Sequence, residues 1–85
     1  MAAPNVVIDG FQFTPEVLTV KRGTTVTFVN KDATPHTVSP EGKAKFVGID
    51  RLMSGESKTI TFKERGIQSY FCQFHTTMMG KVVVK

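Results

Sequence analysis

The feature that most constrains the fold is a succession of short alternating stretches, each ended by turn-forming residues, within a chain of only 85 residues. In residues 24–30, Val26 and Phe28 alternate with threonines, which is the period of a β-strand with one buried face. Comparable stretches, the weakest of them at 46–49, occupy residues 5–8, 12–13, 16–20, 36–39, 46–49, 58–62, 67–72 and 81–85. About seven strands at this spacing predict one all-β domain over residues 1–85, either a sandwich or a closed barrel.

Charge and composition exclude several classes of function. Eleven basic and seven acidic side chains give a net charge of +4, and the basic residues are scattered along the sequence. This balance suits docking on an acidic partner, or it simply keeps the surface solvated. The sequence contains no phosphate-binding loop and no stripe of basic and aromatic residues, so we expect no nucleic-acid partner. No apolar run approaches the length of a membrane span.

The chain has a single cysteine, Cys72, and two histidines, His36 and His75. One cysteine cannot form an internal disulfide, which leaves a buried inert thiol, a reactive thiol or a metal ligand. Cys72, His75 and Met78 follow one another at intervals of three residues, between two predicted strands. A tight loop can direct a thiolate, an imidazole and a thioether towards one point, and His36 would add a fourth donor from another strand.

These donor types favour copper. Thiolate and thioether are soft donors that suit copper(I), and imidazole suits copper in both oxidation states. Two histidines and one cysteine in a plane, with a weak axial methionine, form the blue, or type 1, copper sites. Zinc prefers cysteine and histidine without methionine, so Met78 argues against a structural zinc site. Met79 also lies in this loop, but the spacing favours Met78 as the ligand and Met79 as a packing residue.

Two segments of the chain resemble the signature of the cupredoxins. They are the segments Tyr70-Phe71-Cys72 to Val84, and Arg22 to Asp32 followed by Pro35-His36-Thr37-Val38. The short interval between His75 and Met78 is similar to the short-loop members of the family, the amicyanins. The resemblance implies a Greek-key β-sandwich with one type 1 copper. It also implies that His36, Cys72 and His75 are the equatorial ligands and that Met78 is axial.

Two positions depart from the family pattern. Thr37 stands where many members have an asparagine that ties the two ligand segments together, so we expect a weaker tie. Phe74 stands where short-loop members commonly have a proline. Unlike proline, Phe74 has a backbone N–H. We hypothesise that it points at the Cys72 sulfur and raises the reduction potential, which a Phe74→Pro variant would test.

The resemblance implies an electron carrier and not an enzyme, because four protein ligands leave no open metal position for a substrate. We expect a monomer that docks redox proteins near His75, where the imidazole edge would reach the surface. Tyr70 and Phe71 are expected in the core, and Phe74 on the rim around His75. We also expect a periplasmic or otherwise exported protein, although no signal peptide follows Met1.

Two other interpretations remain open. One is a copper-binding or copper-delivery protein without redox traffic, although such a protein would favour an exposed site from which the metal exchanges readily. The other is a cupredoxin domain cut from a larger redox enzyme, which would show the same residues.

Overall fold

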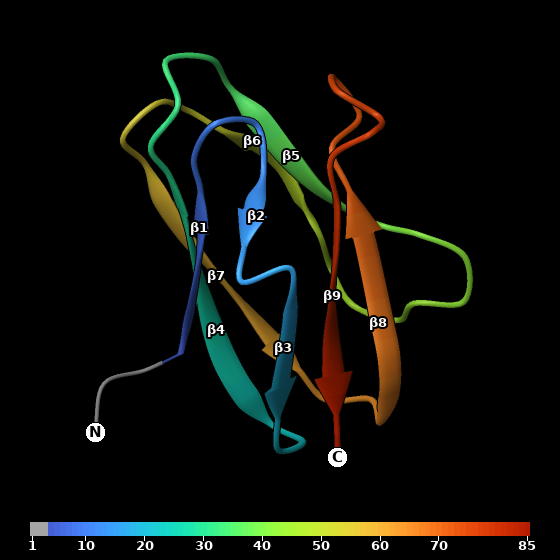
Figure 1. The fold of residues 1–85 in the computed structure, drawn as a ribbon. Helices are drawn as coiled ribbons and strands as arrows, with labels where there is room; N and C mark the ends of the chain where they lie inside the picture. Colours follow the sequence, from blue (N-terminus) through green and yellow to red (C-terminus); the bar gives the residue numbers. More distant parts are fainter. Residues whose placement is uncertain (1–3) are drawn as a thin grey trace.

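Two β-sheets pack face to face in a computed structural model that describes residues 4–85 (Figure 1). The strands are β1 (Asn5–Ile8), β2 (Phe13–Thr14), β3 (Val17–Val20), β4 (Thr24–Asn30), β5 (His36–Pro40), β6 (Ile49–Leu52), β7 (Ser57–Phe62), β8 (Gly66–Phe71) and β9 (Met79–Val84). One sheet has the order β2-β1-β4-β7 and the other β3-β9-β8-β5-β6. The predicted all-β sandwich is confirmed, with nine strands instead of about seven. The described residues contain no helix long and apolar enough to cross a membrane.

The core lies between the sheets and consists of the inward-facing positions that the alternation predicted. Val26 and Phe28 of β4 are fully buried. The buried ring of Tyr70 packs edge-on against Phe13 and Phe28, with ring centroids 4.9 and 5.5 Å apart. Phe71 was also expected in the core but is only half-buried, because successive side chains of a strand point to opposite faces of the sheet.

The weak strand expected at residues 46–49 is displaced, since β6 begins at Ile49 and ends at Leu52. Gly48 comes so close to the backbone of β5 that a Cβ atom there would collide with the carbonyl oxygen of Val38. Phe46 lies in the preceding loop and turns inward, with its ring 5.1 Å from that of Phe62. The apolar pattern at 46–49 therefore reflects an inward-facing loop residue and a close backbone approach, not a strand.

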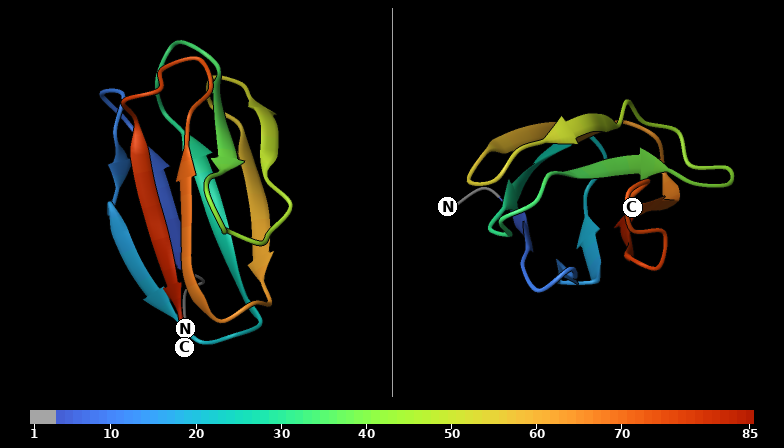
Figure 2. Two further views of the ribbon diagram at one scale, coloured as in Figure 1. Left: turned by 90° about the vertical axis from the view of Figure 1, so that its right-hand side faces the viewer. Right: turned by 90° about the horizontal axis from the view of Figure 1, so that it is seen from above.

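The strand directions bring the candidate ligands to one end of the sandwich. β5 begins at His36, β8 ends one residue before Cys72, and β9 begins one residue after Met78. Because β8 is antiparallel to both β5 and β9, the start of β5, the end of β8 and the start of β9 meet at the same edge. Figures 1 and 2 show the loop between β8 and β9 at this end, beside the start of β5.

Candidate metal centre

Three candidate ligands lie together at this end of the molecule. One donor atom of each of His36, Cys72 and His75 lies within 4.8 Å of the others. Nδ1 of His36 is 3.6 Å from Sγ of Cys72. His36 and Cys72 are fully buried, whereas His75 is half-buried. One ion could therefore contact all three donors and still lie close to the surface on the side of His75.

The loop that carries Cys72, His75 and Met78 is closed by three backbone hydrogen bonds. The His75 N–H donates to the Cys72 carbonyl at 3.2 Å, and the Met78 N–H donates to the His75 carbonyl at 2.9 Å. The Cys72 N–H donates to the Met78 carbonyl at 3.1 Å. The loop is thus two consecutive tight turns, which begin at Cys72 and at His75.

The two neighbouring methionines differ sharply in exposure. Met78 is 3% exposed, whereas Met79, the first residue of β9, is 52% exposed. The expected packing role of Met79 is therefore wrong, because its side chain lies on the outer face of the sheet. Met53, in the turn between β6 and β7, is 47% exposed.

Asp32 orients the ring of His36. Burial raises the pKa of the Asp32 carboxyl, but hydrogen bonds from the Phe11 N–H, from His36 and from the Gly10 N–H outweigh burial and hold the pKa below its usual value. Oδ2 of the ionised carboxylate lies 2.8 Å from Nε2 of His36. Because a carboxylate only accepts hydrogen bonds, Nε2 carries the proton and Nδ1 keeps a free lone pair. That nitrogen faces Cys72.

Phe11 covers the two histidines from the turn between β1 and β2. Its ring stacks on His75 with centroids 4.7 Å apart, and it meets His36 edge-on at 5.5 Å. Phe11 has a left-handed backbone with φ of 59°, which is unfavourable for a residue with a side chain. The backbone N–H groups of Gly10 and Phe11 donate to the Asp32 carboxylate at 2.8 and 3.0 Å. The carboxylate that orients His36 therefore also holds this strained turn.

Asn30, at the end of β4, fixes the segment that leads to His36. Its buried side-chain amide donates to the carbonyls of Thr34 and Leu52 at 2.8 and 2.9 Å. Its Oδ1 accepts the N–H of Asp32 at 2.9 Å.

Sequence analysis missed Asn30, Asp32 and Phe11 as parts of this site. A local signal existed for Asn30, because an asparagine that accepts an N–H two residues later is a common turn former. For Phe11 the sequence held no such signal, since its position depends on Asp32, which is 21 residues away.

Thr37 ties the two ligand segments together. Its Oγ1 accepts the Gln73 N–H at 2.8 Å and lies 3.0 Å from the Ser39 hydroxyl. Its backbone N–H donates to Sγ of Cys72 at 3.4 Å. Threonine thus reaches the other segment by accepting a backbone hydrogen bond. Among residues 4–85, the hydrogen-bond partners of this sulfur are the Thr37 N–H and the His36 ring, so the structure gives no support to the hydrogen bond hypothesised for Phe74.

The cluster fits a soft metal ion. Nδ1 of His75 is buried and has no hydrogen-bond partner within the described part of the chain. An unpaired buried polar atom costs about 1–3 kcal/mol, and an ion bound at the cluster would remove that cost. A thiol and two imidazoles, with the thioether of the buried Met78 in the same loop, form the donor set that suits copper.

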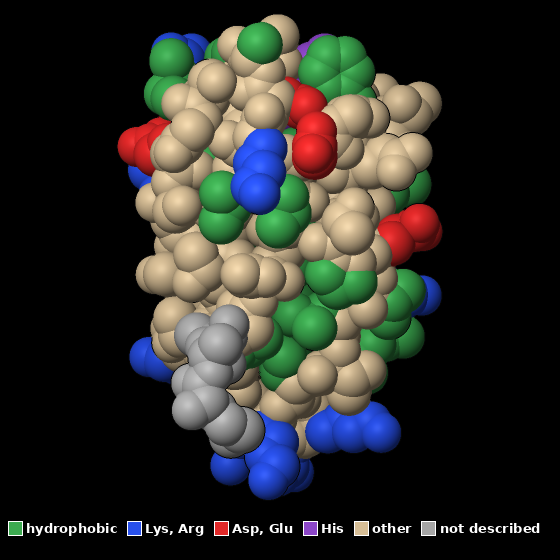
Figure 3. All heavy atoms as spheres, turned by 60° about the vertical axis from the view of Figure 1, so that its left-hand side comes forward, with side chains coloured by type: hydrophobic (Ala, Val, Ile, Leu, Met, Phe, Trp, Pro, Cys, Tyr) green, Lys and Arg blue, Asp and Glu red, His purple; other side chains and the backbone are tan. Residues whose placement is uncertain are grey.

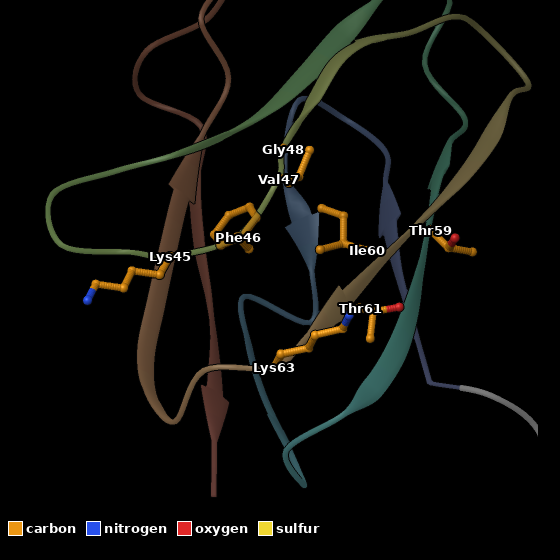
Figure 4. A pocket seen from close by; sticks show the side chains of 8 residues that line it. All are labelled: Lys45, Phe46, Val47, Gly48, Thr59, Ile60, Thr61 and Lys63. Carbon is orange, nitrogen blue, oxygen red and sulfur yellow. The ribbon is translucent and has the colours of Figure 1, made fainter.

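A surface hollow of about 410 Å³ lies apart from this cluster, between residues 45–48 and β7 (Figure 4). Its polar side chains are Lys45, Thr59, Thr61 and Lys63, and none of the candidate metal ligands lines it. The hollow is therefore not part of the candidate metal centre.

Comparison with known proteins agrees with this chemistry. Residues 3–85 match the sequence model of a family described as copper binding proteins, plastocyanin/azurin family. The chain belongs to this family. Amicyanin from Paracoccus versutus is 41% identical over an alignment of 76 positions that covers 85% of this chain and 56% of that protein. Plastocyanin from Chlamydomonas reinhardtii is 32% identical over an alignment of 85 positions that covers 87% of this chain and 59% of that protein.

The fold of the family is also the fold of this chain. A reduced Cu(I) form of an amicyanin variant at pH 4 superposes with a TM-score of 0.90 at 31% identity. The superposition covers 100% of this chain and 84% of that chain. The cupredoxin resemblance found in the sequence is therefore confirmed. The chain spans less than two thirds of the length of the curated amicyanins and plastocyanin that it matches.

Proposed function

We propose that this protein is an electron carrier that holds one type 1 copper ion on His36, Cys72, His75 and Met78. The observation that carries the proposal is the convergence of three donor atoms within 4.8 Å, at one end of a plastocyanin/azurin-type sandwich. The buried Met78, in the same loop, supplies the fourth donor. When bound, copper supplies a one-electron couple between its two oxidation states.

The protein favours the reduced state through burial. A thiolate and two neutral imidazoles leave a site with copper(II) one positive charge, whereas the same site with copper(I) is neutral. Because burial disfavours a net charge, the buried Cys72 and His36 raise the reduction potential. The hydrogen bonds of Asp32 and Thr37 hold these ligands in place in both states, so electron transfer requires little movement.

Electrons enter and leave at the exposed side of His75, which is the least buried of the proposed ligands. The large apolar side chains at this end of the strands are half-exposed, between 47% and 52%; they are Phe11, Met53, Phe74 and Met79. An apolar surface of this kind suits transient docking of another redox protein. We place the docking site there, on a monomer that acts in the periplasm or another exported compartment and is not an enzyme.

The test is the visible absorption spectrum of the purified protein after addition of copper(II), repeated after addition of ascorbate. We expect an intense blue thiolate-to-copper band that disappears on reduction. Cys72→Ser should abolish the band, and Met78→Leu should shift it, whereas Met79→Leu should leave it unchanged. A protein that binds zinc but gives no blue band with copper would contradict the proposal.

A further inference from the structure

Positively charged side chains gather at the end of the molecule opposite the metal cluster. We call this end the basic pole, and its members are Lys21, Arg22, Lys63, Arg65 and Lys85. They come from the β3–β4 turn, from the β7–β8 turn and from the residue after β9, and all five are exposed. Figure 3 shows Lys and Arg side chains gathered at this lower end.

Backbone hydrogen bonds hold the three segments of the basic pole side by side. The Arg22 N–H donates to the Lys85 carbonyl at 3.2 Å, and the Lys85 N–H donates to the Val20 carbonyl at 2.9 Å. The Gly23 N–H donates to the Phe62 carbonyl at 2.7 Å, next to Lys63. The cations are therefore neighbours because the fold places these segments together, although they lie far apart in the sequence.

The net charge of the molecule resides at this pole. Counting side chains alone, the pole holds five cations and one acidic residue, Glu64. The six remaining basic residues are balanced by the six remaining acidic ones. Within residues 4–85 none of the five cations forms an ion pair. The molecule is thus a dipole with its positive end away from the metal cluster.

A redox partner at the basic pole would be poorly placed to exchange electrons. β4 runs from the pole at Thr24 to the metal end at Asn30, and its length alone is about 20 Å. Electron tunnelling falls steeply with distance, whereas His75 lies at the surface of the opposite end. The pole therefore calls for an occupant that does not take electrons.

We propose that the basic pole binds the surface of a membrane that contains anionic phospholipid, with the metal end facing away from it. Cations spread over two turns and the end of β9 match a diffuse array of lipid phosphates, and each contributes attraction at such a surface. Ile67, two residues after Arg65, is 60% exposed and adds an apolar contact for the interfacial region. In this orientation the protein stays near the membrane while His75 remains open to redox partners.

The experiment is co-sedimentation of the copper-loaded protein with vesicles of phosphatidylcholine, with and without phosphatidylglycerol, at low ionic strength. We expect binding only to the vesicles with phosphatidylglycerol and loss of binding as salt is added. A pole variant replaces four cations by glutamine: Lys21→Gln, Arg22→Gln, Arg65→Gln and Lys85→Gln. Its affinity should fall about 600-fold, since each of the four cations contributes roughly fivefold.

A matched control has the same net charge as the pole variant but loses exposed cations elsewhere: Lys31→Gln, Lys43→Gln, Arg51→Gln and Lys58→Gln. We expect it to lose much less affinity. Equal losses in both variants would show that only net charge matters and would overturn the proposal, as would absence of binding to the anionic vesicles. Binding of both proteins to polyglutamate is measured as well. If the pole variant still bound the vesicles but no longer bound polyglutamate, the pole would be a site for an acidic protein, and the membrane proposal would be overturned.

Discussion

At the scale of single residues, Asp32 has the most consequences for the metal centre. Its carboxylate accepts hydrogen bonds from the ring of His36 and from the backbone of Gly10 and Phe11. One side chain therefore sets the tautomer of a metal ligand and also holds the turn whose Phe11 ring stacks on His75. Such partners of metal ligands commonly affect a site almost as much as the ligands do.

We expect Asp32→Ala to lower the free energy of unfolding of the metal-free protein by about 2 kcal/mol, because three hydrogen bonds are lost. Urea denaturation measures this change, with Asp50→Ala, at an exposed position, as the control.

The stability that Asp32 contributes should also depend on pH, because the folded-state pKa of its carboxyl is lowered. This contribution is present above the usual pKa of 3.8 and is lost as pH falls through the folded-state value. The difference between wild type and variant should therefore shrink in acid, and a difference that grew there would contradict this account.

At the scale of secondary-structure elements, the contact between β8 and β9 sets the geometry of the ligand loop. Tyr70 and Gly80 are paired in register, and each lies two residues from the loop of Cys72 to Met78, in which the chain turns twice. Gly80 gives the ring of Tyr70 room to lie over β9, since a Cβ atom there would be 2.7 Å from Cε1 of the ring. The absence of a side chain at this position is therefore part of how the loop is anchored.

Gly80→Ala should destabilise the protein by about 2 kcal/mol, because the added methyl group forces the Tyr70 ring out of its packed position. The measurement is a double-mutant cycle with Tyr70→Leu, in which chemical denaturation gives the free energy of unfolding of each variant. The double variant should lose less stability than the two single variants together. Strict additivity would show that the Tyr70 contact is not the cause.

At the scale of the whole molecule, the size of the domain makes bound metal important for stability. A chain of 85 residues buries a smaller fraction of its surface than a larger domain does. The proposed ligands come from β5 and from the loop between β8 and β9, so one ion would link segments that are 36 residues apart.

Removal of copper should therefore lower the melting temperature. Free copper at about a thousandfold above its Kd adds about 4 kcal/mol, which corresponds to on the order of 20 °C for a domain of this size. Differential scanning calorimetry of the copper-loaded and metal-free protein measures the shift. Cys72→Ser should show a much smaller one. An equal shift in both would mean that copper stabilises the fold from another site.

The sequence by itself determined what depends on local spacing. The alternation of residues 24–30 and 58–62 defines strands and their buried faces, because the period of a strand is set by its own backbone. The three-residue intervals of Cys72, His75 and Met78 likewise define a loop that can present three donors. Both could be predicted because they require no knowledge of distant segments, whereas the cupredoxin fold was implied by the resemblance to that family.

Only the tertiary structure decided what depends on segments far apart in the chain. The hydrogen bonds from Gly10 and Phe11 to Asp32 span 22 and 21 residues, and the basic pole combines cations from residues 21–22, 63–65 and 85. In the sequence these cations are scattered, and they become one surface only because two turns and the end of β9 lie at the same edge of the sandwich. Long-range approach, which no local period encodes, thus set the surroundings of the ligands and the direction of the molecular dipole.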